Sequence, residues 1–299
     1  MRVAIEQGWI PGPTIINSGI IIGGMGGQFN PTPEMVKQHD IVYPEYLDAD
    51  TPDEIIKAVR QNVLFGAKFI KIMVDSQPYP YTVDDMRLFV KEAANAGGLK
   101  VAGHVQTEEG ARRAIEAGIW SIEHDIALIE HDNAHTDELH KLMAQKGIWR
   151  VGTETPFTEY EGNQAEFDRR VKGLKSAYAN GVKMAFSTDA DYYVPGMTRG
   201  EVVINFLKSW KASGIPAKEI LKIMTVNGYK VSDIYDKRGP IKPGFPADII
   251  AVKGNPLEEI DALRTVVFVM KDGLVFKRDG VMTPERFLHS GPVNGWSIR

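Results

Sequence analysis

The chain contains 299 residues, of which 43% are hydrophobic and 25% are charged, a composition typical of a globular protein with a large core. Lysine and arginine number 35 against 39 acidic residues, and the net charge of −4 argues against a nucleic-acid-binding role, which requires a basic surface. Cysteine is absent, which excludes disulfides, thiolate nucleophiles and cysteine-based metal clusters. Any metal must therefore be held by His, Asp, Glu or a modified Lys.

The opening residues, MRVAIEQGWIPGP, lack the apolar segment of a signal peptide. They predict a short helix that ends at Gly8 and is stopped by Pro11. Further along, no apolar run approaches the ~18–20 residues that cross a membrane. We therefore expect a cytoplasmic protein without membrane contact.

Short apolar runs then alternate with amphipathic helical patterns, which is typical of βαβ units and a parallel sheet, and so of an α/β fold. The expected strands are 14–17, 69–74, 100–104, 120–124, 148–152 and 182–187. The expected helices lie near 53–65, 83–96, 108–117, 136–146, 164–180, 199–212 and 216–235.

The pattern changes at Gly239. The segment GPIKPGFPADIIAVKGNP is rich in proline and glycine, and TVVFVMKDGLVFK places a Lys-Asp-Gly turn between two β-rich runs, which indicates a hairpin. We expect an α/β body over residues 1–238, followed by a small β appendage and tail over residues 239–299.

Four ionisable residues lie at the carboxyl ends of expected strands: Lys71, His104, His124 and Asp189. In a barrel of parallel strands these ends share one mouth, where active sites lie. A single His on an apolar strand is more often a core residue whose hydrogen bonds are satisfied. Because a buried Lys or Asp without a partner is costly, the combination of all four favours a shared site.

Several longer stretches resemble one known family. They are AIEQGWIPGPTIINSG, FIKIM, VAGHVQTEEGARRAIEAGIWSIEHD, VKMAFSTDAD and KPGFPADIIAVKGNPLEEIDALRTVVFVMKDGLVF. From residue 1 to about 278 the sequence is similar to the metal-dependent amidohydrolase superfamily, in particular its imidazolonepropionase-like and prolidase branch. The resemblance implies a TIM-barrel-type (β/α) body.

The resemblance also implies roles for the four residues. Lys71 matches a lysine that is often carbamylated and bridges two metals, and His104 and His124 match ligands of the second metal. Asp189 matches the aspartate that binds the first metal and moves the proton. Neutral imidazoles and oxygen anions suit Zn²⁺ or another divalent metal, which lowers the pKa of a bound water to ~7.

The sequence departs from the family pattern at its start. The family's first strand ends in His-x-His, a motif that occurs nowhere in this sequence. By motif, 14–17 matches the third family strand, so we expect a body that lacks the first two strands, with a β-sandwich remnant at the carboxyl end. We therefore expect at most one well-formed metal site. Two unpaired sheet edges favour a homo-oligomer.

The expected function is metal-dependent hydrolysis of an amide, a peptide (Xaa-Pro-like) or an ester bond in a small molecule. The alternative is a non-catalytic or weakly active protein that binds a small molecule or a partner chain, because the His-x-His ligands are absent. Tyr81, Tyr192 and Tyr193 are candidates for substrate contact, although packing roles are equally consistent with the sequence. His131 and His135 are interpreted as solvated loop residues rather than ligands.

Overall fold

The structure is a computed structural model that describes residues 1–25, 46–75, 79–124, 133–156, 164–190 and 193–283. Its helices are α1 (Arg2–Glu6), α4 (Pro52–Leu64), α5 (Val83–Gly97), α6 (Glu108–Ala117), α7 (Asn133–Lys146), α9 (Gln164–Ala179), α10 (Arg199–Asn205), α11 (Leu207–Ala212), α12 (Ala217–Met224), α13 (Val226–Val231) and the 3-10 helix η3 (Ile260–Thr265).

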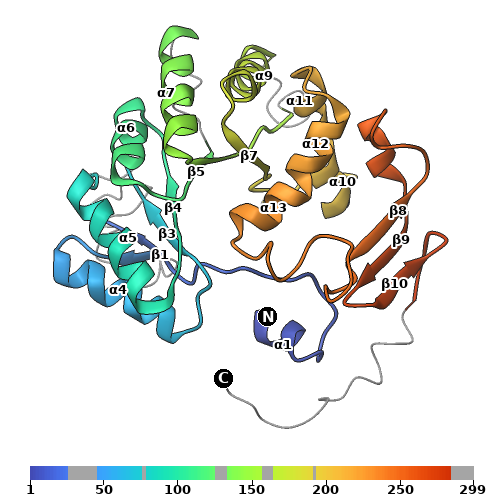
Figure 1. Ribbon diagram of the computed structural model, residues 1–299, viewed down its shortest axis with the longest axis horizontal. Helices are drawn as coiled ribbons and strands as arrows, with labels where there is room; N and C mark the ends of the chain where they lie inside the picture. The colour runs from blue at the N-terminus through green and yellow to red at the C-terminus, as the bar shows by residue number, and fades with distance from the viewer. Residues whose placement is uncertain (26–45, 76–78, 125–132, 157–163, 191–192, 284–299) are drawn as a thin grey trace.

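A parallel sheet forms the body, which confirms the expected α/β class. Its strands are β1 (Ile21–Gly23), β2 (Tyr46–Asp48), β3 (Ile70–Met73), β4 (Val101–His104), β5 (Ser121–His124), β6 (Trp149–Gly152) and β7 (Lys183–Phe186). They lie in the order β2-β1-β3-β4-β5-β6-β7, so β2 and β7 are the edges within the described chain. Figure 1 shows α4 to α7 following the outer side of this sheet.

Two expectations about the first strands are wrong. Residues 14–17 are not a strand; the chain pairs four residues later, at β1, which lies between β2 and β3. Pro11 and Pro13 cannot donate ladder hydrogen bonds, whereas Ile22 is fully buried between its neighbours. Strand β2 was not expected, so the described part of the sheet has seven strands rather than six.

Helix boundaries follow local capping chemistry. Thr51 and Thr82 begin α4 and α5 with capping boxes, in which the threonine hydroxyl and a carboxylate three residues later satisfy each other's backbone N–H groups. Gly118 ends α6 in the left-handed conformation, with φ of 76°. The expected helices at 199–212 and 216–235 are each interrupted: α10 gives way to α11 after Phe206, and α12 gives way to α13 at Thr225.

The two faces of the parallel sheet differ in chemistry. On the outer face, Ile70, Ile72 and Ile122 are fully buried in the main hydrophobic core beneath the helices. On the inner face, alternate residues line a groove of about 400 Å³, among them Lys71 and Glu123. Charged side chains therefore project from the side of the sheet that the outer helices leave uncovered.

A second, antiparallel sheet forms near the carboxyl end. It contains β8 (Ile249–Val252), β9 (Val266–Lys271), β10 (Leu274–Arg278) and β11 (Val281–Met282), in the order β11-β10-β9-β8. Asp272 and Gly273 connect β9 to β10 with φ values of 53° and 78°, as a two-residue hairpin with the right twist requires. The predicted hairpin is therefore confirmed. In Figure 1 this sheet lies at the far end of the molecule from α4.

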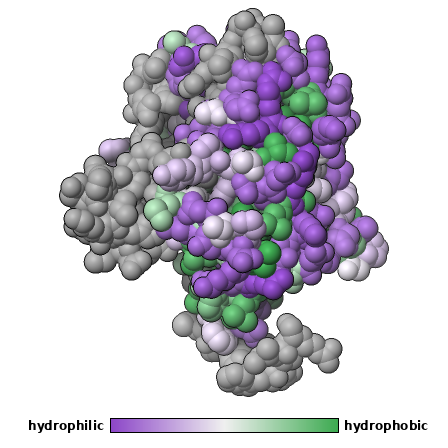
Figure 2. Space-filling model, turned by 90° about the vertical axis from the view of Figure 1, so that its left-hand side faces the viewer, coloured by the Kyte–Doolittle hydropathy of each residue, from purple (hydrophilic) through white to green (hydrophobic). Residues whose placement is uncertain are grey.

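The surface over the outer helices is largely hydrophilic, with a narrower hydrophobic band in its lower half (Figure 2). Leu64 and Phe65, at the end of α4, are among the exposed apolar residues, at 79% and 72% exposure. Within the described residues, no helix is both long and apolar enough to cross a membrane.

Candidate active site

Three of the four predicted site residues lie at or just after the carboxyl ends of strands, whereas Lys71, expected at such an end, is the second residue of the four-residue strand β3. His104 and His124 are the last residues of β4 and β5, Lys71 lies within β3, and Asp189 follows β7. His124 and Asp189 both have left-handed backbones, with φ of 73° and 48°. Residues other than glycine rarely hold this conformation, and such positions cluster at functional sites.

The two histidines are in direct contact. Their ring centroids lie 4.4 Å apart, with the ring planes inclined by 57°. Nδ1 of His124 lies 3.5 Å from Oδ2 of Asp189 and 3.5 Å from the Thr153 hydroxyl. Nε2 of His104 is buried and has no hydrogen-bond partner among the described residues. One imidazole nitrogen is thus already desolvated and still able to accept a ligand bond.

Burial keeps both imidazoles neutral. It lowers the pKa of His104 to about 3, with the positive charge of Lys71 adding to the effect. Burial likewise lowers the pKa of His124 to about 2, assisted by repulsion from Lys71 and from His104. At neutral pH the contact between His124 and Asp189 is therefore one between a neutral ring and a carboxylate, and both rings have the protonation state that metal ligation requires.

Lys71 has a buried carboxylate as its counter-charge. Burial lowers the pKa of Lys71, while attraction to Glu123 and to Asp189 opposes that change. Burial raises the pKa of Glu123, which Lys71 and a 2.6 Å hydrogen bond from the Ser121 hydroxyl oppose. The structure therefore brings Lys71, His104, His124 and Asp189 within electrostatic reach of one another, and it adds Glu123.

Sequence reasoning missed Glu123 although a signal was present. In the segment Ser121-Ile122-Glu123, Ile122 faces the apolar core while Ser121 and Glu123 line the inner groove. This alternation is the ordinary two-residue period of a strand, and it puts a carboxylate on the same face as Lys71.

The loop after β4 is tied down next to His104. Asp75, which follows β3, accepts hydrogen bonds from the backbone N–H groups of Gln106 and Thr107 at 2.8 and 2.6 Å. It also accepts one from the Thr107 hydroxyl, which in turn begins α6. This clamp joins the ends of β3 and β4 and thereby holds the strand end that carries His104.

The three predicted substrate-contact tyrosines have different surroundings. Tyr81 is 4% exposed, donates its hydroxyl to the Ala49 carbonyl at 2.9 Å and packs edge-on against Phe89. It is a core residue, so the packing alternative holds for it. Tyr193 is 78% exposed beyond the Asp189 strand end. Tyr192 and His131 lie outside the described residues, and His135 is within α7 without a described side chain.

The residues present fit a single divalent metal better than a pair. Two neutral imidazoles, one with an unpartnered nitrogen, and a nearby carboxylate are a donor set suited to Zn²⁺. Within the described parts of the chain, no group of three or more His, Asp or Glu side chains is arranged as a metal site. Among the described residues, Lys71 in modified form is a further candidate ligand.

The chain is similar in sequence to a curated protein. The chain is 28% identical to ochratoxinase from Aspergillus niger over 316 aligned positions, which cover 93% of this chain and 63% of ochratoxinase. The chain therefore spans 63% of the length of the curated relatives that it matches.

Solved structures with a similar fold include the same relative. The crystal structure of A. niger ochratoxinase superposes with a TM-score of 0.72 over 93% of this chain and 69% of that one. A Xaa-Pro dipeptidase with methionine bound in its active site is 31% identical, with a TM-score of 0.72 and coverage of 92% and 71%. Phenylurea hydrolase B, at 18% identity and a TM-score of 0.71, shares the fold.

The family profile extends through nearly the whole chain. It begins at residue 1, continues through the parallel sheet with its paired histidines, and ends at residue 276 in β10 of the small sheet. This chain belongs to the amidohydrolase family.

Proposed function

We propose that this protein is a metal-dependent hydrolase of an amide or peptide bond in a small molecule, with Xaa-Pro dipeptides as the first substrates to test. An ester is the alternative substrate class. The observation that supports the proposal is the pair of buried, neutral imidazoles of His104 and His124 beside the Asp189 carboxylate. The similarity to ochratoxinase and to a Xaa-Pro dipeptidase supports a carbon–nitrogen bond as the target.

Each residue has a role set by its environment. His104 and His124 would hold the metal through neutral nitrogens, with Lys71 as a further ligand if its amine adds CO₂ to form a carbamate. A bound divalent cation would supply a water of lowered pKa and would polarise the scissile carbonyl. Asp189, whose side chain is 66% exposed near its strand end, would accept the proton of the attacking water and return it to the leaving amine.

A second candidate rests on the number of ligands. The sequence contains no His-x-His, and the three ligands named above are fewer than two metals require. A family member with this set would bind one metal, a small molecule or a partner chain, with little or no turnover. Its predicted behaviour differs from that of the hydrolase only in the rate, so metal content and turnover must be measured on the same preparation.

The decisive experiment measures zinc, manganese and cobalt per chain and then hydrolysis of a panel of Xaa-Pro dipeptides, N-acyl amino acids and esters, before and after chelation. For the hydrolase, we expect turnover that chelation abolishes and added metal restores. His104→Ala and His124→Ala should each lose both bound metal and turnover.

His140→Gln is the matched control. His140 is fully buried but lies on α7, where its Nδ1 bonds the Ser176 hydroxyl at 2.7 Å, and glutamine can keep that bond. This variant should retain metal and rate. Stoichiometric metal without turnover on any substrate would favour the binding protein, and turnover that survives exhaustive chelation would contradict both candidates.

A further inference from the structure

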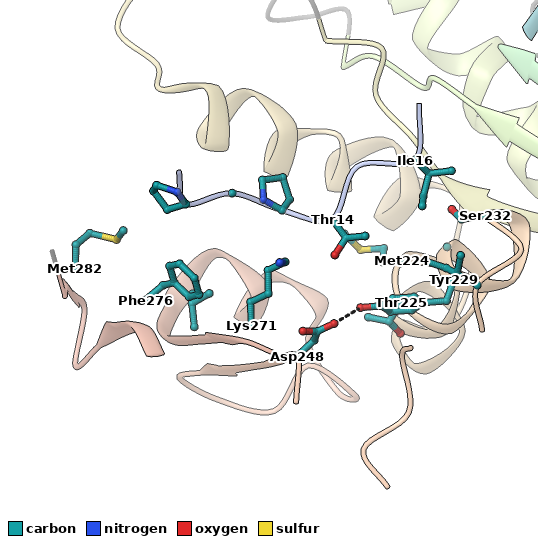
Figure 3. Close-up of a pocket in the computed structure, with 16 residues that line it drawn as sticks. Thr14, Ile16, Met224, Thr225, Tyr229, Ser232, Asp248, Lys271, Phe276 and Met282 are labelled. Carbon is teal, nitrogen blue, oxygen red and sulfur yellow. Dashed lines mark hydrogen bonds between the residues drawn. The ribbon is translucent and has the colours of Figure 1, made fainter. Parts of the chain in front are cut away.

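A second cavity lies between the body and the small sheet. Its volume is about 720 Å³, and three separate parts of the chain line it: the segment 11–16, the region of α12 and α13, and the small sheet. Figure 3 shows Phe276 and Met282 at one end of the cavity and Ile16, Met224 and Tyr229 at the other, with Lys271 and Thr14 between them. Sites for small organic ligands have volumes of roughly 300–1,000 Å³ and mostly apolar walls.

The wall formed by the segment after α1 is fixed in place. Trp9 donates its backbone N–H to the Ala4 carbonyl at 2.8 Å, and α1 packs Ile5 so closely on Gly12 that a Cβ there would lie 2.4 Å from the isoleucine Cδ1. At the other end, Arg238 donates to the Thr14 hydroxyl. Pro11 and Pro13 restrict the backbone between these anchors. The cavity is therefore held open by the fold.

The polar groups in the cavity offer more donors than acceptors. Asp248 is occupied: Oδ1 accepts the Asp272 backbone N–H at 3.0 Å, and Oδ2 lies 3.3 Å from Nε of Arg238 and 3.5 Å from the Tyr229 hydroxyl. Lys271 gives one hydrogen bond to Asp272 at 2.8 Å. An ammonium group has three N–H donors, and Figure 3 shows this side chain pointing into the cavity beside Thr14.

The charges around this end are balanced. Two cations, Lys271 and Arg238, are paired with two carboxylates, those of Asp248 and Asp272. A ligand carboxylate would bring a third negative charge next to those two, whereas an uncharged carbonyl oxygen could accept from Lys271 without that repulsion. The complement of this end is therefore a neutral hydrogen-bond acceptor.

Two of the strands that form the sheet wall, β9 and β10, cannot accept an added peptide strand, and the third, β11, is an edge strand of only two residues. β9 is paired with β8 and β10, and β10 is paired with β9 and β11, so both present side chains rather than a free backbone edge to the cavity. Strand addition requires such an edge. A small molecule is the occupant that fits.

We propose that this cavity is a binding site for an apolar, uncharged small molecule that has one carbonyl acceptor, with its ring or branched aliphatic body between Phe276, Met282 and Met224 and its carbonyl oxygen on Lys271. The site is separate from the proposed hydrolysis, because His104, His124 and Asp189 take no part in its lining. It does share Ile16, Gly228 and Ser232 with the groove that holds Lys71 and Glu123.

The test is isothermal titration of the full chain with 4-(biphenyl-4-yl)butanamide and with the matching carboxylic acid and primary amine. The amide should bind one molecule per chain and more tightly than the acid or the amine. Lys271→Met should weaken amide binding by about tenfold to a hundredfold, the range for a hydrogen bond to a charged group, and Lys271→Arg should restore most of it.

Further variants separate the cavity from the rest of the protein. Met282→Trp, at a position 58% exposed, should fill the cavity from its rim and abolish amide binding without loss of fold. Lys91→Met, on the exposed side of α5, and His104→Ala should bind the amide as the parent does. Equal binding by the parent, Lys271→Met and Met282→Trp would overturn the proposal. Absence of amide binding to the parent protein would also overturn it. So would a decrease in amide binding that accompanies self-association in light scattering, because a second copy would then cover this face.

Discussion

The imidazole rings of His104 and His124 lie with their centroids 4.4 Å apart, at the ends of adjacent strands. Each ring is buried, and each would repel the other if both became charged. Burial and the positive charge of Lys71 lower the pKa of His104 to about 3, and the same two causes together with His104 lower that of His124 to about 2. The fold therefore keeps two ligand-competent nitrogens unprotonated far below the ordinary histidine pKa of ~6.5.

This has a measurable effect on stability in the metal-free protein. In the unfolded chain both histidines bind protons near pH 6.5, whereas in the folded chain they do not, so their contribution to stability is complete above pH 6.5 and is lost as the pH falls. Each histidine should lower the free energy of unfolding by about 1.4 kcal/mol per pH unit below pH ~6. Denaturant titrations with a chelator at pH 7.5, 6.0 and 5.0 measure the slope, and His104→Gln should reduce it by about 1.4 kcal/mol per pH unit. An unchanged slope would show that His104 is protonated in the folded state.

Asp189 is the proposed proton acceptor, and its charge can be removed without changing its shape. Asp189→Asn should lower kcat by about 10²–10⁴-fold, the usual contribution of general acid–base catalysis, while metal binding by the histidines is at least partly retained. Asparagine tolerates the left-handed backbone at this position, so the fold should not be strained. Asp279→Asn, at an exposed hairpin residue with φ of 52°, is the matched control and should leave kcat unchanged. An Asp189→Asn enzyme with the parent's rate would remove Asp189 from the mechanism.

Glu123 should govern how readily Lys71 takes up CO₂. The Glu123 carboxylate favours the ammonium form of Lys71, and only the free amine adds CO₂, losing a proton as the carbamate forms. Glu123→Gln keeps the size of the side chain and removes the attraction, so we expect more carbamate on Lys71. The ¹³C signal of the carbamate after incubation with ¹³C-bicarbonate measures it, and Lys71→Met should show no such signal. A weaker signal in Glu123→Gln than in the parent would mean that Glu123 supports the carbamate instead.

We also expect a homo-oligomer whose interface includes an open edge of the parallel sheet. The sequence predicts the strands at 14–17 and 182–187 as the two edges, and in the structure the edges of the described sheet are β2 and β7. On β7, the Met184 carbonyl already accepts a 2.8 Å hydrogen bond from the Asn227 side chain. Unpaired backbone groups at a buried edge each cost on the order of 1–3 kcal/mol, which favours coverage by another copy. Light scattering at micromolar concentration should give a multiple of the monomer mass, and a monomer would contradict this. The double variant Leu64→Glu/Phe65→Glu should remain oligomeric, because these residues lie at the end of α4 and not at an edge of the sheet. If this variant were monomeric, the interface would lie at the end of α4 instead.

Sequence alone determined the features that depend on neighbours along the chain. The alternation of strands and helices, the threonine cap of α6, the glycine that ends it and the Asp272-Gly273 hairpin follow from local propensity and turn chemistry. The positions of His104 and His124 at strand ends were likewise evident from the pattern, because a strand's end is marked by the residues that follow it.

Tertiary structure decided the rest. Strand β2 has only three residues, and it is a strand because β1 pairs with it. Tyr81 lies in the core because its hydroxyl donates to the Ala49 carbonyl and its ring packs against Phe89. Glu123 interacts with Lys71 only when β3 and β5 lie in one sheet. The cavity at Lys271 is lined by residues as far apart in the chain as Pro11 and Met282. Each of these features depends on contacts between segments far apart in the chain, and local sequence preferences do not specify which distant segments will meet.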